Sequence, residues 1–356
     1  MKILYVLNRK PNIAGIQVTT RNRVKALRER QIDAEVMFFE HGNAEYLFDD
    51  IPHFFINNSQ QFQNHLLSKE YDFISYIYSP QYLDSIPENY KSKILFEIRG
   101  WSSSVTKALT QINKSNRFNA IICIAEYIKP LVEKRLKKNI PVFVDGNLVP
   151  FNFKPLAPRK RNWKEFLKRK RNHKIIGFVG SLNAAKNWEE WIKIGKGVSE
   201  NEQIELWIIC RTLESAQEKQ LKELSERLGL TGRIKILPSV PNSEMPNIYS
   251  IIAKSGGCIL STSPREGLGN HILEPMACGC PVVSSNRPGK NEMIIHKYNG
   301  LLYELGDIDG AIRQIKELFN NEYLRMEIIN KAILTIEQKY RAQNYVDRYL
   351  QILSQI

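Results

Sequence analysis

The sequence predicts an α/β protein made of two doubly wound domains with parallel sheets. Short apolar runs typical of buried strands alternate with helical patterns along the whole chain, which is the order that βαβ units produce. The alternation restarts after a strongly basic stretch near residues 151–172. The length of 356 residues is also that of about two ordinary domains.

The first half contains six predicted strands, at residues 3–7, 34–39, 73–78, 94–98, 120–124 and 141–144. The run 3–7 leads through Pro11 and Gly15 into a helical pattern that ends near Arg30, and further helical stretches separate the later strands. Strands joined through helices pair in parallel. We therefore expect a first domain over residues 1–150.

The second half shows the same alternation, although no sequence repeat relates the halves. Its predicted strands are residues 175–179, 204–209, 234–237, 257–261, 281–284 and 301–303, and the helices between them are residues 188–198, 213–228 and 270–278. The stretch 329–356 is helical with a break near residues 339–341. We expect a second domain over residues 173–337, with residues 151–172 as a linker.

The composition excludes a disordered chain and a membrane-spanning one. Hydrophobic residues make up 43% and charged residues 25%, as in ordinary globular proteins. The mean hydropathy is −0.35, and the apolar runs are far shorter than the about 20 residues of a spanning helix. The run 3–7 is too short for the core of a signal peptide. We expect a soluble, cytoplasmic protein.

The five cysteines and six histidines show no metal-ligand spacing. No Cys-x-x-Cys occurs, and four of the cysteines lie in or beside apolar runs. This pattern predicts reduced cysteines in the core and no structural metal.

The most informative segment is residues 263–274, Ser-Pro-Arg-Glu-Gly-Leu-Gly-Asn-His-Ile-Leu-Glu, which follows a predicted strand and opens a predicted helix. Backbone N–H groups in such a turn suit a diphosphate, which makes Gly267, Leu268, Gly269 and Asn270 candidate donor-binding residues. Carboxylates beside an anion site are favourable where they accept hydrogen bonds from neutral sugar and ribose hydroxyls. Glu266 and Glu274 therefore indicate a nucleotide-sugar site.

These two glutamates, together with the run Met276-Ala277-Cys278-Gly279-Cys280-Pro281-Val282-Val283, closely resemble glycosyltransferase family 4, the group 1 transferases of the GT-B fold. The resemblance covers most of residues 173–304, and residues 1–150 only in pattern. It implies two Rossmann-like domains facing a central cleft, with the C-terminal helix 338–356 packing back on the first domain. It also implies that Glu266 contacts the donor sugar and Glu274 the ribose, and that Glu292 matches a further acid of the family.

A second element of the resemblance lies in residues 178–186, where a strand gives way to a helix. The family has a Gly-Arg turn here and a lysine five residues after the arginine, and both cations hold the diphosphate. Lys186 stands at the lysine position, whereas Ser181 replaces the arginine. Arg211, at the end of the next strand, could compensate for the missing cation.

In the first half of the chain, fewer residues match the motifs of the family. Gly15 is the one remaining glycine of a loop that lies near the donor phosphate and the acceptor in the family, and a simple turn explains it nearly as well. Many members have a histidine after the strand at residues 94–98, whereas this chain has Arg99 and Trp101. Arg99 is the candidate for stabilising charge at this position, and Trp101 for stacking on a sugar.

One motif is better explained by structure than by chemistry. Asp307-Ile308-Asp309 has the Asp-x-Asp form of a metal-binding glycosyltransferase motif, but it precedes a helical pattern that begins near Ala311. An acid at a helix start accepts hydrogen bonds from free N–H groups and suits the helix dipole. We expect Asp307 to cap that helix.

The resemblance implies a glycosyltransferase that moves a sugar from a nucleotide diphosphate sugar to an acceptor hydroxyl in cell-surface polysaccharide, teichoic acid or glycoconjugate synthesis. It implies retention at the anomeric carbon, no metal and no cofactor, with a UDP-sugar favoured over a GDP-sugar. Glu266, Lys186 and Arg99 are the candidate catalytic residues. Two alternatives stay open: a relative with epimerase-like chemistry on the same donor, and a non-catalytic partner that binds a glycan or nucleic acid.

Most of the net charge of +14 lies in the linker, since residues 151–174 hold ten Lys or Arg and one acid. The candidate membrane or acceptor patch consists of Arg159, Lys160, Arg161, Trp163, Lys168, Arg169, Lys170 and Arg171. Trp163, Phe166 and Leu167 fall on one face of a short helix surrounded by cations. Three interpretations remain: a solvated connection, contact with an anionic membrane that leads to a lipid-linked or polymer acceptor, and, least favoured, nucleic-acid binding.

Overall fold

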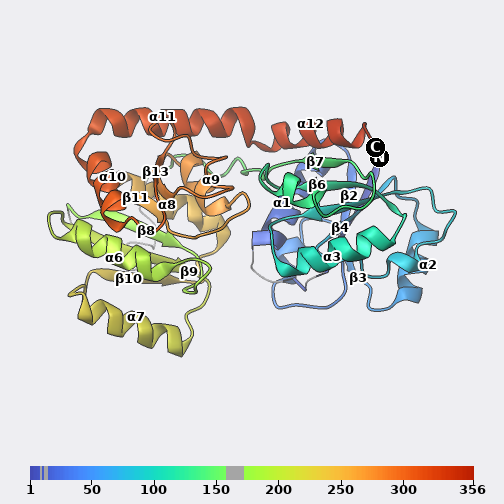
Figure 1. The fold of residues 1–356 in the computed structure, drawn as a ribbon, viewed down its shortest axis with the longest axis horizontal. Coiled ribbons are helices and arrows are strands. Elements are labelled where there is room, and N and C mark those ends of the chain that lie inside the picture. Colours follow the sequence, from blue (N-terminus) through green and yellow to red (C-terminus); the bar gives the residue numbers. More distant parts are fainter. Residues whose placement is uncertain (9, 12–14, 158–171) are drawn as a thin grey trace. The chain divides into compact units, whose positions relative to one another are not determined.

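The computed structural model describes residues 1–8, 10–11, 15–157 and 172–356. The chain divides into two compact units, one formed by residues 1–148 and 340–356 and the other by residues 149–339 (Figure 1). The chain therefore crosses between the units twice, at Leu148–Val149 and at Lys339–Tyr340. Each unit is described by itself below.

The first unit contains a seven-stranded parallel sheet in the order β3-β2-β1-β4-β5-β6-β7. Its strands are β1 (Lys2–Leu7), β2 (Asp33–Phe38), β3 (His53–Phe55), β4 (Phe73–Ile77), β5 (Lys93–Ile98), β6 (Phe118–Cys123) and β7 (Val142–Val144). The central strands are buried along almost their whole length, as in a parallel sheet covered on both faces.

The helices of this unit are α1 (Gly15–Glu29), α2 (Ser59–Ser68), α3 (Ser103–Lys114), α4 (Ile128–Glu133) and the C-terminal α12 (Ala342–Leu353). Short 3₁₀ turns lie at Glu45–Phe48 and Leu83–Ser85. A buried arginine of α1 joins several of these elements. The Arg23 guanidinium lies 3.3 Å from the Glu97 carboxylate and 4.8 Å from the centre of the Tyr345 ring of α12. This contact fastens the last helix of the chain to its first domain.

The second unit contains a six-stranded parallel sheet in the order β10-β9-β8-β11-β12-β13. Its strands are β8 (Lys174–Val179), β9 (Ile204–Cys210), β10 (Ile234–Pro238), β11 (Cys258–Ser261), β12 (Val282–Ser285) and β13 (Leu301–Tyr303). Its helices are α6 (Trp188–Ser199), α7 (Ser215–Arg227), α8 (Met245–Lys254), α9 (Asn270–Ala277), α10 (Ile308–Asn320) and α11 (Glu322–Lys339), with a 3₁₀ turn at Asn242–Glu244.

Glycines let α6 approach its neighbours closely. A Cβ atom on Gly195 would lie 2.7 Å from the Leu206 side chain of β9, and one on Gly197 would lie 2.2 Å from the Ile312 side chain of α10. The apolar face of α6, which includes Trp191 and Ile192, is thereby buried in the core of the unit.

The predicted order of strands is confirmed with small shifts at the ends, but one strand, β3, and one helix, α8, were missed. β3 has only three residues, all half-buried, which is too short for a periodic pattern. The final helical stretch begins at Glu322 rather than residue 329 and is interrupted at Tyr340 and Arg341. The two GT-B-type sheets are the predicted architecture.

Two further structural predictions are confirmed. Asp307 caps α10, where its carboxylate accepts a hydrogen bond from the Gly310 N–H at 2.9 Å. All five cysteines are buried and form no disulfide. Among the described residues, no helix has the length and apolar character needed to cross a bilayer.

Candidate active site

The candidate site lies where the strand order of the second sheet reverses. β8 leads through α6 to β9 on one side, while β11 pairs with β8 on the other side. Ligands of open parallel sheets bind beside such a reversal, at the carboxyl ends of the strands. The loop 180–187 follows β8 and the loop 262–269 follows β11, so both begin at this edge.

Hydrogen bonds join the two loops directly. The Thr262 hydroxyl, which comes just after β11, donates to the backbone carbonyls of Lys186 and Asn187 at 2.9 Å each. Asn187 has a left-handed backbone with φ of 51°, and its amide group donates to Glu190 at 2.7 Å. The position of Lys186 is therefore set by the β11 loop as well as by its own.

Lys186 and Glu266 form the central ion pair of the site. The Lys186 ammonium lies 2.5 Å from the Glu266 carboxylate, and both side chains are largely buried. Gly180 makes room for this lysine, because a Cβ atom there would lie 3.2 Å from three carbons of the Lys186 side chain. The Gly180 φ of 148° also favours glycine. Sequence analysis predicted both residues in the site but not their direct pairing.

The Glu266 carboxyl is held in its ionised form. Burial opposes ionisation, but His271, which is protonated in the acidic range where Glu266 titrates, the charge of Lys186, and hydrogen bonds from Lys186 and Ser263 together lower the pKa of Glu266 to about 2. Glu266 therefore carries a full negative charge at neutral pH.

His271 lies beside this pair in a neutral form. Its Nε2 atom is 3.0 Å from the Ser261 hydroxyl and 3.8 Å from the Glu266 carboxylate. Burial, followed by repulsion from Lys186, lowers the pKa of His271 to about 3. Gly269, the N-cap residue of α9, must lack a side chain, since a Cβ atom there would lie 2.6 Å from the imidazole ring.

Glu274 occupies a different environment one turn further along α9. It is buried, and the Tyr249 hydroxyl of α8 donates a hydrogen bond to its carboxylate at 3.1 Å. Burial raises the pKa of Glu274 to about 7, although hydrogen bonds from Tyr249 and Asn242 oppose the shift. Two glutamates eight residues apart therefore differ by several units in pKa.

The remaining predicted donor residues of the second unit lie in the same group of loops. Gly267, Leu268 and Gly269 follow Glu266, and Asn270 begins α9. Ser181 is exposed just after β8, and Arg211 is half-buried just after β9, where its carbonyl accepts a hydrogen bond from Ser239 at 2.7 Å. Glu292 is half-buried in the segment between β12 and β13.

Gly15 and Arg99 belong to the first unit and are described there alone. Gly15 is the first residue of α1, after β1. Arg99 follows β5, is buried and pairs with the Glu97 carboxylate. The Trp101 ring lies against the Arg135 guanidinium, 4.9 Å from its carbon. The linker patch from Arg159 to Arg171 lies outside the described residues.

Sequence analysis missed three residues of this site: His271, Tyr249 and Lys290. Lys290 is fully buried and donates to the Ser261 carbonyl at 3.2 Å and the Ser285 hydroxyl at 2.7 Å. His271 could have been recognised from its place at the start of α9. Nothing in the sequence signals Tyr249 or the burial of Lys290, because the contact of Tyr249 with Glu274 spans 25 residues and that of Lys290 with Ser261 spans 29. Among the described residues, no group of three or more His, Cys, Asp or Glu could hold a metal ion.

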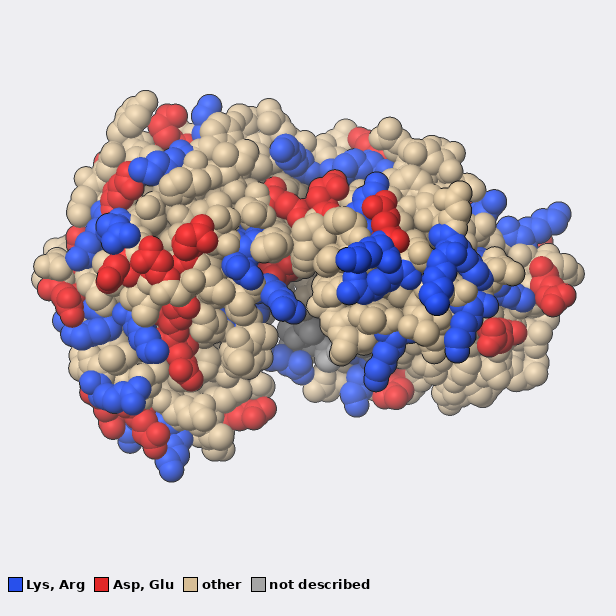
Figure 2. Space-filling view, in the orientation of Figure 1, with Lys and Arg blue, Asp and Glu red and all other residues tan. Residues whose placement is uncertain are grey.

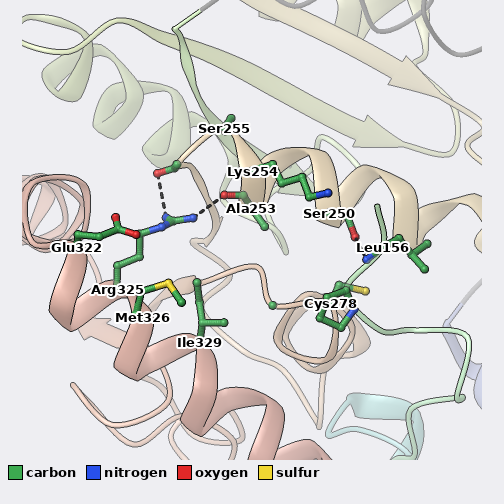
Figure 3. A pocket seen from close by; sticks show the side chains of 13 residues that line it. Leu156, Ser250, Ala253, Lys254, Ser255, Cys278, Glu322, Arg325, Met326 and Ile329 are labelled. Atoms are coloured by element: carbon green, nitrogen blue, oxygen red, sulfur yellow. Dashed lines mark hydrogen bonds between the residues drawn. The ribbon is translucent and has the colours of Figure 1, made fainter. Parts of the chain in front are cut away.

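A pocket of about 560 Å³ in the same unit lies at the other edge of the sheet (Figure 3). It is lined by residues that precede β11 and β12, such as Ser255 and Cys278, and by α11. Arg325 closes one side, since its guanidinium donates to the carbonyls of Ala253, Gly256 and Gly257 at the end of α8. This pocket is separate from the Lys186–Glu266 site because parallel strands begin and end at opposite edges.

Comparisons with known proteins point to one family. Residues 159–335 match the family model described as glycosyl transferases group 1. The lipopolysaccharide core biosynthesis glycosyltransferase LpsE of Rhizobium meliloti (strain 1021) is 25% identical over 255 residues, which cover 69% of this chain and 67% of that protein. The capsular polysaccharide biosynthesis glycosyltransferase CapM of Staphylococcus aureus is 27% identical over 229 residues, which cover 63% of this chain and 58% of CapM.

The fold is also found among solved structures. The structure of Anabaena Alr3699/HepE in complex with UDP and glucose superposes with a TM-score of 0.83 at 18% identity, over 100% of both chains. The sucrose-phosphate synthase of Thermosynechococcus elongatus superposes with a TM-score of 0.80 at 14% identity, over 100% of this chain and 99% of that one. At these identities the likeness concerns the fold alone.

The environment of Glu274 predicts a pH-dependent effect of Glu274→Gln on stability. Because its pKa is raised from 4.5 to about 7, its contribution to folding is complete below pH 4.5 and is lost as pH rises through 7. Glutamine stays neutral, so the variant should gain roughly 2–3 kcal/mol over the wild type between pH 5 and pH 8. Urea unfolding of the ligand-free chain measures this gain. The exposed Glu226→Gln is the control, and an equal effect of Glu274→Gln at both pH values would contradict the assigned ionisation.

Proposed function

The chain belongs to the group 1 glycosyltransferases, and on that premise we propose that it transfers a sugar from a nucleotide diphosphate sugar to an acceptor hydroxyl. The transfer proceeds with retention at the anomeric carbon and without a metal ion. LpsE and CapM, which act in lipopolysaccharide core and capsular polysaccharide biosynthesis, support a place for this chain in cell-envelope glycan synthesis. The HepE complex with UDP supports a uridine nucleotide as donor.

The observation that carries this proposal is the Lys186–Glu266 pair at the strand reversal, with Glu274 one turn into the adjoining helix. A cation beside backbone N–H groups at a helix start suits a diphosphate. The ionised Glu266 suits hydroxyl donors of a sugar ring, and Glu274 suits the ribose hydroxyls. Diphosphate, sugar and ribose are the groups that a nucleotide sugar presents.

The chemistry proposed for these residues is electrostatic. As the bond between sugar and diphosphate breaks, negative charge grows on the diphosphate and positive charge on the ring. Lys186 and the amides of residues 267–270 stabilise the diphosphate, and Glu266 orients the sugar and faces the developing positive charge. Because these groups are fixed by Thr262, Gly180 and the start of α9, little reorganisation accompanies the step.

The first test is donor cleavage in the presence of a chelator. The chain, given a panel of UDP-sugars and GDP-sugars, should release the nucleoside diphosphate at a rate unaffected by EDTA. Lys186→Met should lower kcat about 10²–10³-fold, because it removes a preorganised charge at the leaving group. Activity that is lost in EDTA and restored by manganese or magnesium would overturn metal independence, and cleavage of no donor would overturn the proposed reaction.

The two glutamates should differ in what they bind. Glu274→Ala should weaken binding of UDP and of the UDP-sugar equally, by roughly 1–3 kcal/mol, the range for a hydrogen bond to a charged group. Glu266→Ala should weaken binding of the UDP-sugar and leave UDP nearly unaffected. Calorimetry of both variants with both ligands measures the difference. The same loss for both ligands in both variants would contradict the assigned roles.

We further propose that the protein works on the cytoplasmic face of a membrane, close to a lipid-linked or polymer acceptor. The linker patch that suggested this lies outside the described residues, but the first unit carries a second concentration of charge. Residues 107–138 hold eight Lys or Arg and two acids. Figure 2 shows lysines and arginines gathered on the visible face of this unit. Sequence analysis overlooked this concentration because it assigned most of the basicity to the linker.

Four lysines of this segment are available to an anionic surface. Lys107, Lys114, Lys134 and Lys137 are exposed, and none has a carboxylate within 4.0 Å among the described residues. Each Lys or Arg near an anionic lipid surface contributes about 1 kcal/mol. Together with the linker, this unit offers enough unpaired charge for reversible membrane binding.

Vesicle sedimentation tests this part of the proposal. The chain should sediment with phosphatidylglycerol vesicles but not with phosphatidylcholine vesicles, and binding should fall steeply with salt. Replacing Lys107, Lys114, Lys134 and Lys137 with Gln should weaken binding at least 10-fold without changing UDP affinity. The matched control replaces four exposed lysines of the second unit, Lys193, Lys219, Lys222 and Lys254. A loss confined to Arg169→Gln, Lys170→Gln and Arg171→Gln would assign the contact to the linker, and no sedimentation at low salt would exclude it.

A further inference from the structure

Lys290 is a buried cation placed beneath the loop that carries Glu266. Its exposed fraction is 0%, and its ammonium joins the ends of two neighbouring strands, through the Ser261 carbonyl of β11 and the Ser285 hydroxyl of β12. Lysine is almost never fully buried unless it is paired. An anionic partner is therefore expected for the Lys290 ammonium.

The described residues provide no such partner in contact. No carboxylate lies within 4.0 Å of the Lys290 ammonium, and its two hydrogen-bond acceptors are neutral. Burial lowers the pKa of Lys290 to about 7; Glu266 and Glu190 oppose this shift, and Lys186 and Arg287 add to it. The lysine is therefore charged in only part of the molecules near neutral pH, and an added anion would favour the charged form.

Hydrogen bonds connect Lys290 to the donor-binding loop on two sides. The Ser285 hydroxyl, which accepts from Lys290, donates to the Ser263 carbonyl at 3.1 Å, and the Ser263 hydroxyl in turn bonds to Glu266. On the other side, Ser261 places its hydroxyl 3.0 Å from His271. A change in the charge of Lys290 therefore acts on the segment that holds Glu266.

We propose that Lys290 is a positioning residue for the donor diphosphate, which takes up one proton from solvent when the diphosphate binds at Lys186 and thereby supplies the second positive charge of the site. In this role it stands in for the cation that Ser181 does not provide. The neutral amine becomes an ammonium, and no other bond changes. The inference rests on the proposed function, since it requires a diphosphate at this site.

A pH experiment must separate proton exchange by Lys290 from proton exchange by the titratable groups around it. His271 and Glu266 titrate far below neutral pH, so they exchange no protons between pH 6 and 8. Glu274 has a pKa of about 7 and would release a proton on accepting ribose hydroxyls. The proton released by Glu274 would offset the proton taken up by Lys290. The Glu274→Gln substitution removes this release.

The test is calorimetry of UDP binding to the full chain in buffers of different ionisation enthalpy. The terminal phosphate of UDP also titrates, with a pKa of about 6, and its proton release is common to all variants. Relative to the same chain with Lys290→Met added, proton uptake by the Glu274→Gln chain should rise from near zero at pH 6 to nearly one proton at pH 8, and its UDP affinity should fall about 10-fold over that range. The Glu274→Gln, Lys290→Met chain should lose this uptake and bind UDP more weakly, and the proton exchange that remains should be that of UDP itself. Lys235→Met is the matched control, because Lys235 is a partly buried lysine of β10 whose pKa is also lowered, and it should leave the uptake unchanged.

The outcomes separate this inference from the proposed function. UDP binding with no proton uptake at pH 8 in the Glu274→Gln chain would overturn the role of Lys290 and leave the donor site intact. The same uptake in Lys290→Met as in its parent would also overturn it. The absence of UDP or GDP binding by the wild type would overturn the proposed function, and this inference with it.

Discussion

The reversal of strand order between β8 and β11 is the constraint on which the site depends. In a parallel sheet every strand ends at the same edge. Only at a reversal of strand order do the loops after two neighbouring strands lead to opposite sides of the sheet. Here those loops carry Lys186 and Glu266, which lie 80 residues apart in the chain and 2.5 Å apart in space. Thr262 fixes the backbone between them, and Gly180 and Gly269 leave room for the charged and aromatic side chains that meet there.

The ionisation of each titratable group in the site is set by its environment rather than by its residue type. Glu266 is surrounded by a lysine, a histidine and a hydroxyl, and it stays ionised. Glu274, on the helix that follows this loop, has neutral hydrogen-bond partners in Tyr249 and Asn242, and its pKa is near 7. Lys290 has neutral partners as well, and its pKa falls toward 7. The ligand-free site thus contains one firmly fixed ion pair and two groups whose charge a bound nucleotide can change, which is the pattern expected where binding and proton exchange are coupled.

The first unit is held together by a different buried charge. Arg23 of α1 contacts Glu97 and donates to the carbonyls of Asp145 and Gly146, and Tyr345 of α12 covers its guanidinium. Removing one member of such a cluster leaves its partners buried and unpaired, which costs several kcal/mol. The cluster explains why the C-terminal helix belongs to the first unit although residues 149–339 intervene in the sequence. It also includes Glu97, the partner of Arg99, so that the candidate cation after β5 is already engaged in the fold.

The sequence by itself determined the order of most strands and helices, the cap at Asp307 and the buried cysteines, and it singled out Lys186, Glu266 and Glu274 as candidate site residues. These features depend on local periodicity and on short motifs, which neighbouring residues encode. Only the tertiary structure decided which strands lie side by side, that Lys186 pairs with Glu266, that Tyr249 contacts Glu274, and that Lys290 is buried with no carboxylate in contact among the described residues. Burial and contacts between distant residues arise only when the chain folds, and the ionisation of a side chain follows from both. The short strand β3 was missed because three residues carry no period. The charge of segment 107–138 is visible in the sequence, but only the structure shows which of its cations are exposed.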